Sequence, residues 1–170
     1  MMTESKICCF TGHRDISPAH MRRLPKLLEK LISEQIEKGA RTFRAGGARG
    51  FDTLAALAVL DLKERYPDIN LELYLPCKDQ AVKWDERDRR AYEYVLDRSD
   101  KVSYVGQTYF KGCMFVRNRQ LVDGAHVCIA YYDGGTGGTA YTVNYAAERG
   151  VEVKNTYDMI NEKKMLGGLF

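Results

Sequence analysis

The segment from Asp133 to Thr139 has the composition of an anion-binding loop. It holds four glycines and two threonines in seven positions, between an apolar run that ends at Tyr132 and an alanine-rich helical pattern that begins at Ala140. Glycines let the backbone approach a ligand closely, and the unpaired amides of a first helical turn attract anions. The segment therefore predicts a phosphate site, with a tight turn that only needs small residues as the alternative. The residues expected to bind the ligand are Gly134, Gly135, Thr136, Gly137, Gly138 and Thr139.

Gly12, His13 and Arg14 follow another apolar segment and supply further groups that a phosphate site needs. Arg14 can hold a phosphate through two parallel hydrogen bonds, and His13 can donate a hydrogen bond or move a proton. The alternative is that His13 caps a backbone carbonyl and Arg14 is a surface charge. We expect all three residues to lie beside the ligand.

A second glycine-rich segment runs from Gly46 to Gly50 and is followed by Asp52. We expect Arg49, inside this segment, to contact the same anion. Asp52 lies where helix N-cap residues lie, so we expect it to cap the helix that follows, with a ribose hydroxyl as the alternative partner. The glycines expected beside the ligand are Gly46, Gly47 and Gly50.

Two further features are candidates for the site. Trp84 is the only tryptophan, and it is either a core residue or a lid that stacks on a base. Arg117-Asn118-Arg119 opens a helix after a glycine-containing loop. A charged triplet is usually solvated, but at this position we expect one arginine to point inward. We therefore add Arg117 and Asn118 to the predicted ligand contacts.

Apolar strand patterns alternate with helical patterns along the chain. Such alternation indicates parallel βαβ units, so we predict an α/β, Rossmann-like fold: a doubly wound, mainly parallel sheet of five to six strands with helices on both faces. Ligands of doubly wound sheets bind beyond the carboxyl ends of the strands, where the three glycine-rich segments are expected to meet. The predicted strands cover residues 6–11, 42–45, 70–75, 101–105, 126–132 and 152–155, the last at the sheet edge.

The helical patterns lie between these strands. Ser17 and Pro18 are typical of a helix start, and apolar residues at helical spacing then continue as one helix to Gly39. We expect residues 1–170 to form one domain with a C-terminal tail at 156–170, which contains a short helix and a loose Gly167-Gly168 end. The other predicted helices cover residues 53–66, 83–99, 114–122 and 140–149.

The composition is that of an ordinary globular chain. The 170 residues are 45% hydrophobic and 29% charged, with a net charge of +3. Basic and acidic residues are interspersed, so a nucleic-acid partner stays open but is not favoured. No apolar run predicts a membrane span, and we expect a cytoplasmic protein. The five cysteines show no C-x-x-C spacing, so we expect no metal site and no disulfides. We also expect no cofactor.

In combination, these motifs resemble the SLOG superfamily, which includes DprA/Smf and LOG-related proteins, and more narrowly its YpsA-like branch. The resemblance implies a nucleotide-type small-molecule ligand. LOG enzymes release a base from nucleoside monophosphates, and DprA proteins bind single-stranded DNA. The motifs that carry the resemblance are Thr11 to Arg14, Gly46 to Asp52, Gly112 to Met114 with Arg117 to Arg119, and Gly134 to Thr139.

One departure from the enzymes bears on catalysis. Their loop reads P-G-G-x-G-T-x-x-E, and Gly138-Thr139 match its G-T, but Thr142 stands at the glutamate position. Arg117 matches the enzymes' arginine and is one catalytic candidate. Glycosidic cleavage needs a carboxylate that a threonine cannot replace, which leaves Asp133 as a substitute. We therefore expect a sensor or regulatory protein that binds a nucleotide or a nucleotide derivative such as an ADP-ribose-like molecule. The alternatives are a LOG-like phosphoribohydrolase and a DprA-like DNA binder, and a homodimer stays open.

Overall fold

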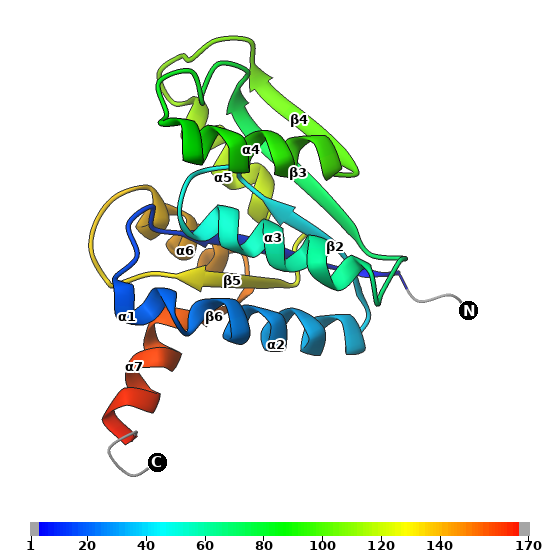
Figure 1. The fold of residues 1–170 in the computed structure, drawn as a ribbon, viewed down its shortest axis with the longest axis vertical. Coiled ribbons are helices and arrows are strands. Elements are labelled where there is room, and N and C mark those ends of the chain that lie inside the picture. Colours follow the sequence, from blue (N-terminus) through cyan, green and yellow to red (C-terminus); the bar gives the residue numbers. More distant parts are fainter. Residues whose placement is uncertain (1–3, 167–170) are drawn as a thin grey trace.

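The computed structural model describes residues 4–166 and contains a six-stranded, all-parallel sheet in the order β4-β3-β2-β1-β5-β6 (Figure 1). The α/β, Rossmann-like fold expected from the sequence is confirmed. The strand order changes direction beside β1, which pairs with β2 on one side and with β5 on the other. The strands are β1 (Lys6–Gly12), β2 (Ala40–Ala45), β3 (Asn70–Cys77), β4 (Lys101–Gly106), β5 (Val127–Tyr131) and β6 (Glu152–Asn155).

Helices cover both faces of the sheet. In Figure 1, α2, α3 and α4 lie in front of the strands, and α5 and α6 lie behind them. The predicted tail contains a helix, α7, and its Gly167-Gly168 end lies outside the described residues. The helices are α1 (Pro18–Met21), α2 (Leu24–Glu37), α3 (Phe51–Lys63), α4 (Glu86–Arg98), α5 (Cys113–Val122), α6 (Gly138–Glu148) and α7 (Thr156–Leu166).

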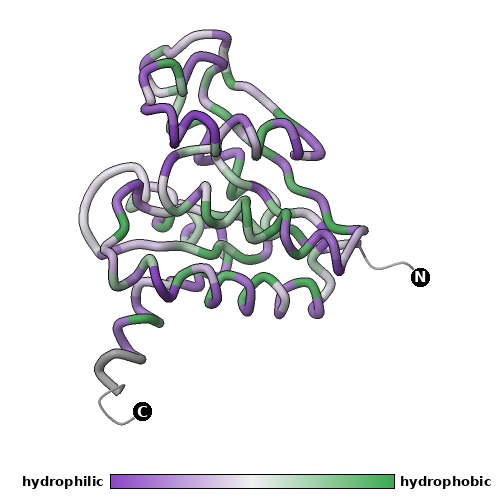
Figure 2. The backbone as a smooth tube through the Cα atoms, in the orientation of Figure 1, coloured by the Kyte–Doolittle hydropathy of each residue, from purple (hydrophilic) through white to green (hydrophobic). Residues whose placement is uncertain are grey.

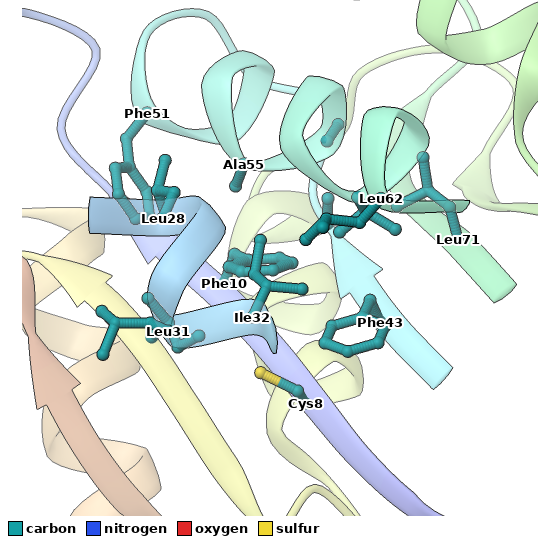
Figure 3. Packing of buried hydrophobic residues seen from close by; sticks show 14 of the residues in the cluster. Cys8, Phe10, Leu28, Leu31, Ile32, Phe43, Phe51, Ala55, Leu62 and Leu71 are labelled. Atoms are coloured by element: carbon teal, nitrogen blue, oxygen red, sulfur yellow. The ribbon is translucent and has the colours of Figure 1, made fainter. Parts of the chain in front are cut away.

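The core has two layers because the side chains of β1 alternate between the faces of the sheet. Cys8 and Phe10 belong to the cluster under α2 and α3, whereas Cys9 belongs to the cluster under α5 and α6. In the front layer, Phe10, Ile32 and Phe43 pack together between α2, α3 and the sheet (Figure 3). The path of the chain is hydrophobic along α3 and mainly hydrophilic along α4, which buries only two residues (Figure 2).

The single helix predicted from Pro18 to Gly39 is wrong. The chain forms two helices, α1 and α2, separated at Arg22 and Arg23. Pro25 explains the break, because proline has no N–H to donate to the carbonyl four residues earlier and its ring clashes with that carbonyl. The proline is accommodated in the first turn of α2. The predicted start of α1 is confirmed, since the Ser17 hydroxyl accepts from the His20 amide at 3.3 Å.

Candidate functional site

A cavity of about 620 Å³ opens where the carboxyl ends of β1 and β5 meet the first turns of α3, α5 and α6. This is the edge of the sheet at which the sequence places a ligand, and we call it the edge cavity. Nine of the predicted site residues line it. They are Gly12, His13, Arg14, Asp52, Arg117, Asn118, Asp133, Gly138 and Thr139.

The other predicted glycines do not line the edge cavity, and two of them have packing roles instead. Gly50, the residue before α3, has a φ of 77°, and a Cβ there would lie 2.1 Å from the carbonyl oxygen of Arg14. A Cβ on Gly47, whose φ is 69°, would lie 2.3 Å from the Leu75 side chain. These glycines therefore let the loops that carry the site pack closely. Besides Arg49 and Trp84, the remaining predicted residues outside the lining are Gly46, Gly134, Gly135, Thr136 and Gly137.

Arg49 and Trp84 contact each other and do not line the edge cavity. The guanidinium of Arg49 lies over the indole ring, 5.5 Å from its centroid. Trp84 is half-buried and meets the ring of Tyr92 edge-on at 5.3 Å. Trp84 is one of the partly buried residues that pack against the core, and its stacking on a base stays a prediction. Because Arg49 is turned toward this tryptophan, it does not join the other two arginines at the cavity.

Asp52 is not the cap of α3, which corrects the sequence prediction. The N-cap is Gly50, and no side chain caps this helix start. The Asp52 carboxylate, 5% exposed, instead accepts a hydrogen bond at Oδ2 from the Ala48 amide at 3.3 Å. Its Oδ1 is buried without a hydrogen-bond partner. Burial raises the pKa of this carboxyl to about 6, although the nearby charge of Arg117 opposes the shift.

Arg117 is the arginine of its triplet that points inward. Its side chain is 4% exposed, and it donates from Nη1 to the carbonyl of Gly46 and from Nε to the Asn118 Oδ1 at 2.8 Å. Burial lowers the pKa of the guanidinium, and the negative charge of Asp52 opposes this effect. A buried guanidinium and a buried carboxylate therefore form the floor of the edge cavity, and each reduces the cost of burying the other.

The rim of the edge cavity collects groups that attract anions. The first turn of α6 lies at this rim. The helix begins after Gly137, and no side chain caps its N-terminus. Arg14 also lines the cavity and is exposed, and no carboxylate in the described part of the chain lies within ion-pair distance of it. Unpaired helix amides and an unpaired guanidinium together favour a phosphate.

Asp133 is paired with His13 and so does not neutralise Arg14. Its Oδ1 lies 2.9 Å from the His13 Nε2 and also accepts from the Gly135 amide at 2.9 Å. The Gly135 hydrogen bond is the main cause that lowers the pKa of Asp133, with a further contribution from His13. This carboxylate is half exposed, and His13 holds it at the edge cavity.

Several aromatic lining residues were missed by the sequence predictions. Tyr131 is the last residue of β5, so its place directly before the glycine loop was a usable signal. Its hydroxyl lies 2.8 Å from the Nδ1 of the buried His20, and its ring meets that of Tyr157 at 5.4 Å. Tyr157 belongs to α7, and nothing local in the sequence connects it with the site. The remaining missed residues of the lining are Thr11, Asp15, Ala48, Tyr109, Gly112, Met114, Phe115 and Leu121.

Thr142, which stands at the glutamate position of the LOG motif, offers nothing to the edge cavity. It is fully buried in α6, and its hydroxyl donates to the Gly138 carbonyl at 2.9 Å. Within residues 4–166, no cluster of three or more His, Cys, Asp or Glu side chains is placed to hold a metal ion. No helix in the same range is long and apolar enough to cross a membrane.

Comparison with known families finds a family model that covers most of the chain. The YpsA family model, described as the YspA SLOG family, matches residues 8–165. The chain belongs to this family. Among its relatives, this SLOG family member is 24% identical over 134 residues to a UPF0398 protein of Bacillus thuringiensis (strain Al Hakam), covering 78% of this chain and 73% of the relative. It is 25% identical over 135 residues to a UPF0398 protein of Bacillus cereus (strain G9842), with the same coverage.

Solved structures show the same fold at low identity. DNA processing protein A (DprA) from Streptococcus pneumoniae matches this SLOG family member with a TM-score of 0.64 and 19% identity, covering 88% of this chain and 49% of that protein. DprA from Helicobacter pylori, described for its single-stranded DNA binding mode, matches with a TM-score of 0.64 and 17% identity, covering 94% and 73%. TM1055, a structural-genomics target, matches with a TM-score of 0.56 and 19% identity, covering 92% and 81%.

Proposed function

We propose that this protein binds a nucleotide or nucleotide-derived ligand of the ADP-ribose type in the edge cavity and acts as a sensor or regulatory protein. A volume of about 620 Å³ lies within the range of roughly 300–1,000 Å³ that small-molecule sites span. Ligands of doubly wound sheets bind at this edge, beside the point where the strand order reverses. The position of the cavity between β1 and β5 fits that rule.

The observation that carries this proposal is the unpaired Oδ1 of Asp52. A buried carboxylate oxygen without a hydrogen-bond partner is costly, and it becomes satisfied when a ligand donates to it. Ribose hydroxyls are such donors, and acidic side chains hold them in other nucleotide-binding α/β proteins. The same cavity is lined by groups that can donate hydrogen bonds to a phosphate, from Arg14, Gly138 and Thr139. The cavity thus offers an acceptor for a sugar and donors for an anion.

A nucleotide panel tests the proposal. We expect ADP-ribose or a related nucleotide to raise the melting temperature of the protein, and mass spectrometry of molecules released from freshly purified protein to identify the natural ligand. Gly138→Val should abolish the melting shift without unfolding the chain, because a Cβ at Gly138 has only the Asn118 amide near it, at 3.9 Å. A shift unchanged by Gly138→Val would remove this loop from the site.

Hydrolysis of nucleoside monophosphates is the second candidate function, and one observation favours it. The Asp52 carboxyl has its pKa raised to about 6, which is the range of carboxylic acids that protonate leaving groups in glycosidases. The buried charge of Arg117 lies nearby. Asp52 is therefore a better catalytic carboxyl candidate than Asp133, whose pKa is lowered. Release of free base from nucleoside 5′-monophosphates distinguishes this function from binding alone.

A further inference from the structure

A second hollow, of about 480 Å³, adjoins the edge cavity. Gly112 and Phe115 line both, so the two spaces are neighbours. We call it the α5–α6 hollow, because it lies against the start of α5 and the first turn of α6. Its lining residues are Phe110, Lys111, Gly112, Phe115, Val116, Arg119 and Tyr141.

The α5–α6 hollow combines aromatic rings with positive charge. Phe110 and Phe115 are 45% and 46% exposed, an unusual position for two large apolar side chains five residues apart. The ring of Tyr141 meets that of Phe115 edge-on at 4.7 Å. The charged residues in the lining are Lys111 and Arg119, both cationic. Aromatic faces beside cations are the features that bind a base together with its phosphate.

Arg119 is fixed in place before any ligand arrives. Its Nη1 donates to the Tyr141 hydroxyl at 2.9 Å, which holds the guanidinium at the wall of the hollow. Preorganised groups lose less side-chain entropy when a ligand binds. Arg119 is therefore preorganised to bind a phosphate group of a ligand that extends from the edge cavity into the hollow.

Beyond the α5–α6 hollow, the positive charge of Lys111 and Arg119 does not continue along α6. Further along α6, the Tyr145 hydroxyl donates to Asp123 at 2.6 Å, and Arg149 lies 3.6 Å from the same carboxylate. Tyr141 and Tyr145 also stack on each other, with ring planes 3° apart. The ring faces that they turn toward each other are therefore not available to a further base. A long nucleic-acid strand needs a continuing basic path, and Asp123 interrupts it.

We propose that the α5–α6 hollow is a second base site and that the ligand carries two nucleobases joined through phosphates. This inference rests on the proposed function, since the first nucleotide must occupy the edge cavity. The second base packs against Phe110 and Phe115, and Lys111 and Arg119 face the phosphates. The ligand class is therefore a dinucleotide, larger than a mononucleotide and shorter than a strand.

Two ligands that differ only in the second base provide the test. ADP-ribose and diadenosine diphosphate share an adenosine and two phosphates, and the latter adds an adenine on the far ribose. By isothermal titration calorimetry we expect diadenosine diphosphate to bind about tenfold more tightly, which is the effect of one stacked base. Phe110→Ala should remove this advantage and leave the ADP-ribose affinity within about twofold, and Phe110→Tyr should retain it.

Tyr94→Ala is the matched control, because Tyr94 is an exposed aromatic residue on α4 with the same 45% exposure as Phe110. It should leave both affinities unchanged. Equal affinities of the wild type for the two ligands would overturn the second base site while leaving the proposed function intact. Binding of neither ligand would overturn both. A thymidine trinucleotide that binds more tightly than diadenosine diphosphate, and is weakened by Phe110→Ala, would assign the hollow to a strand and overturn the dinucleotide.

Discussion

Arg117 and Asp52 share the space directly in front of the α-carbon of Gly46. A Cβ added at Gly46 would lie 2.7 Å from the Arg117 Nη1 and 2.9 Å from the Asp52 Oδ2. Both side chains are almost completely buried, and each is stabilised by the charge of the other. The absence of a side chain at Gly46 therefore leaves the room that these two buried charges occupy in the floor of the edge cavity.

Gly46→Ala should displace these charges. We expect a loss of about 1–3 kcal/mol in the free energy of unfolding, the usual cost of forcing extra volume into a packed interior. Urea denaturation measures it. Gly138→Ala is the matched control, because a new Cβ there would come no nearer than 3.9 Å to the Asn118 amide nitrogen, and the stability of this variant should be unchanged or slightly higher. Equal effects of the two substitutions would mean that the floor accommodates a methyl group.

The Asp52 carboxyl predicts a specific pH dependence of stability. Burial raises its pKa from 3.8 to about 6, so the folded chain holds this proton more tightly than the unfolded chain. The resulting stabilisation is complete below the unfolded pKa and is lost as the pH rises through the folded pKa. Between about pH 4 and pH 7, the wild type should lose roughly 2 kcal/mol of stability relative to Asp52→Asn. The unfolding free energies of the two proteins are measured by urea denaturation at each pH. If they change with pH by the same amount, the raised pKa is contradicted.

Arg14→Gln tests the anion end of the edge cavity. Loss of a charge-assisted contact to phosphate should weaken ADP-ribose binding about tenfold, as measured by calorimetry at fixed ionic strength. Arg22→Gln removes the same charge from an exposed arginine between α1 and α2, outside the cavity lining. It should leave the affinity nearly unchanged. Equal losses in the two variants would mean that only the net charge of the protein matters.

Incubation with nucleoside 5′-monophosphates should release little or no free base, because Thr142 replaces the glutamate of the LOG motif and is buried in α6. Chromatography of the products measures the release. Base release at roughly one per second or faster, lost in both Arg117→Ala and Asp52→Asn, would instead establish hydrolysis and overturn the binding-only expectation.

The fold was predictable from the sequence because its signals are local and repeated. The bounds of β6, Glu152–Asn155, agree with the prediction, since its ends are set by neighbouring residues. The break between α1 and α2 was also readable, because Pro25 is visible in the chain. The apolar spacing on both sides of that proline nevertheless favours one continuous helix, and the steric rule for proline overrides it.

The site was predictable only in part because its contacts join distant segments. Glycine-rich segments after strands indicate an edge site, and His13, Arg14 and Asp133 from these segments line the cavity at that edge. Sequence position alone does not tell which way a loop side chain turns. Asp52 has the position of a cap, but its carboxylate bonds back to Ala48. Arg49 turns to Trp84, 35 positions further on, and no local pattern connects them.

The alternation of β1 that separates Cys8 and Cys9 has a practical consequence for experiments. All five cysteines are free and buried: Cys8, Cys9 and Cys128 lie in the two core layers, Cys77 at the end of β3, and Cys113 in the first turn of α5. A thiol reagent can therefore modify each one only when its own region opens. Alkylation followed by peptide mass spectrometry would then report opening at Cys113, beside the edge cavity, separately from opening at Cys128 in the central sheet. The protein thus carries built-in reporters of local unfolding that need no introduced label.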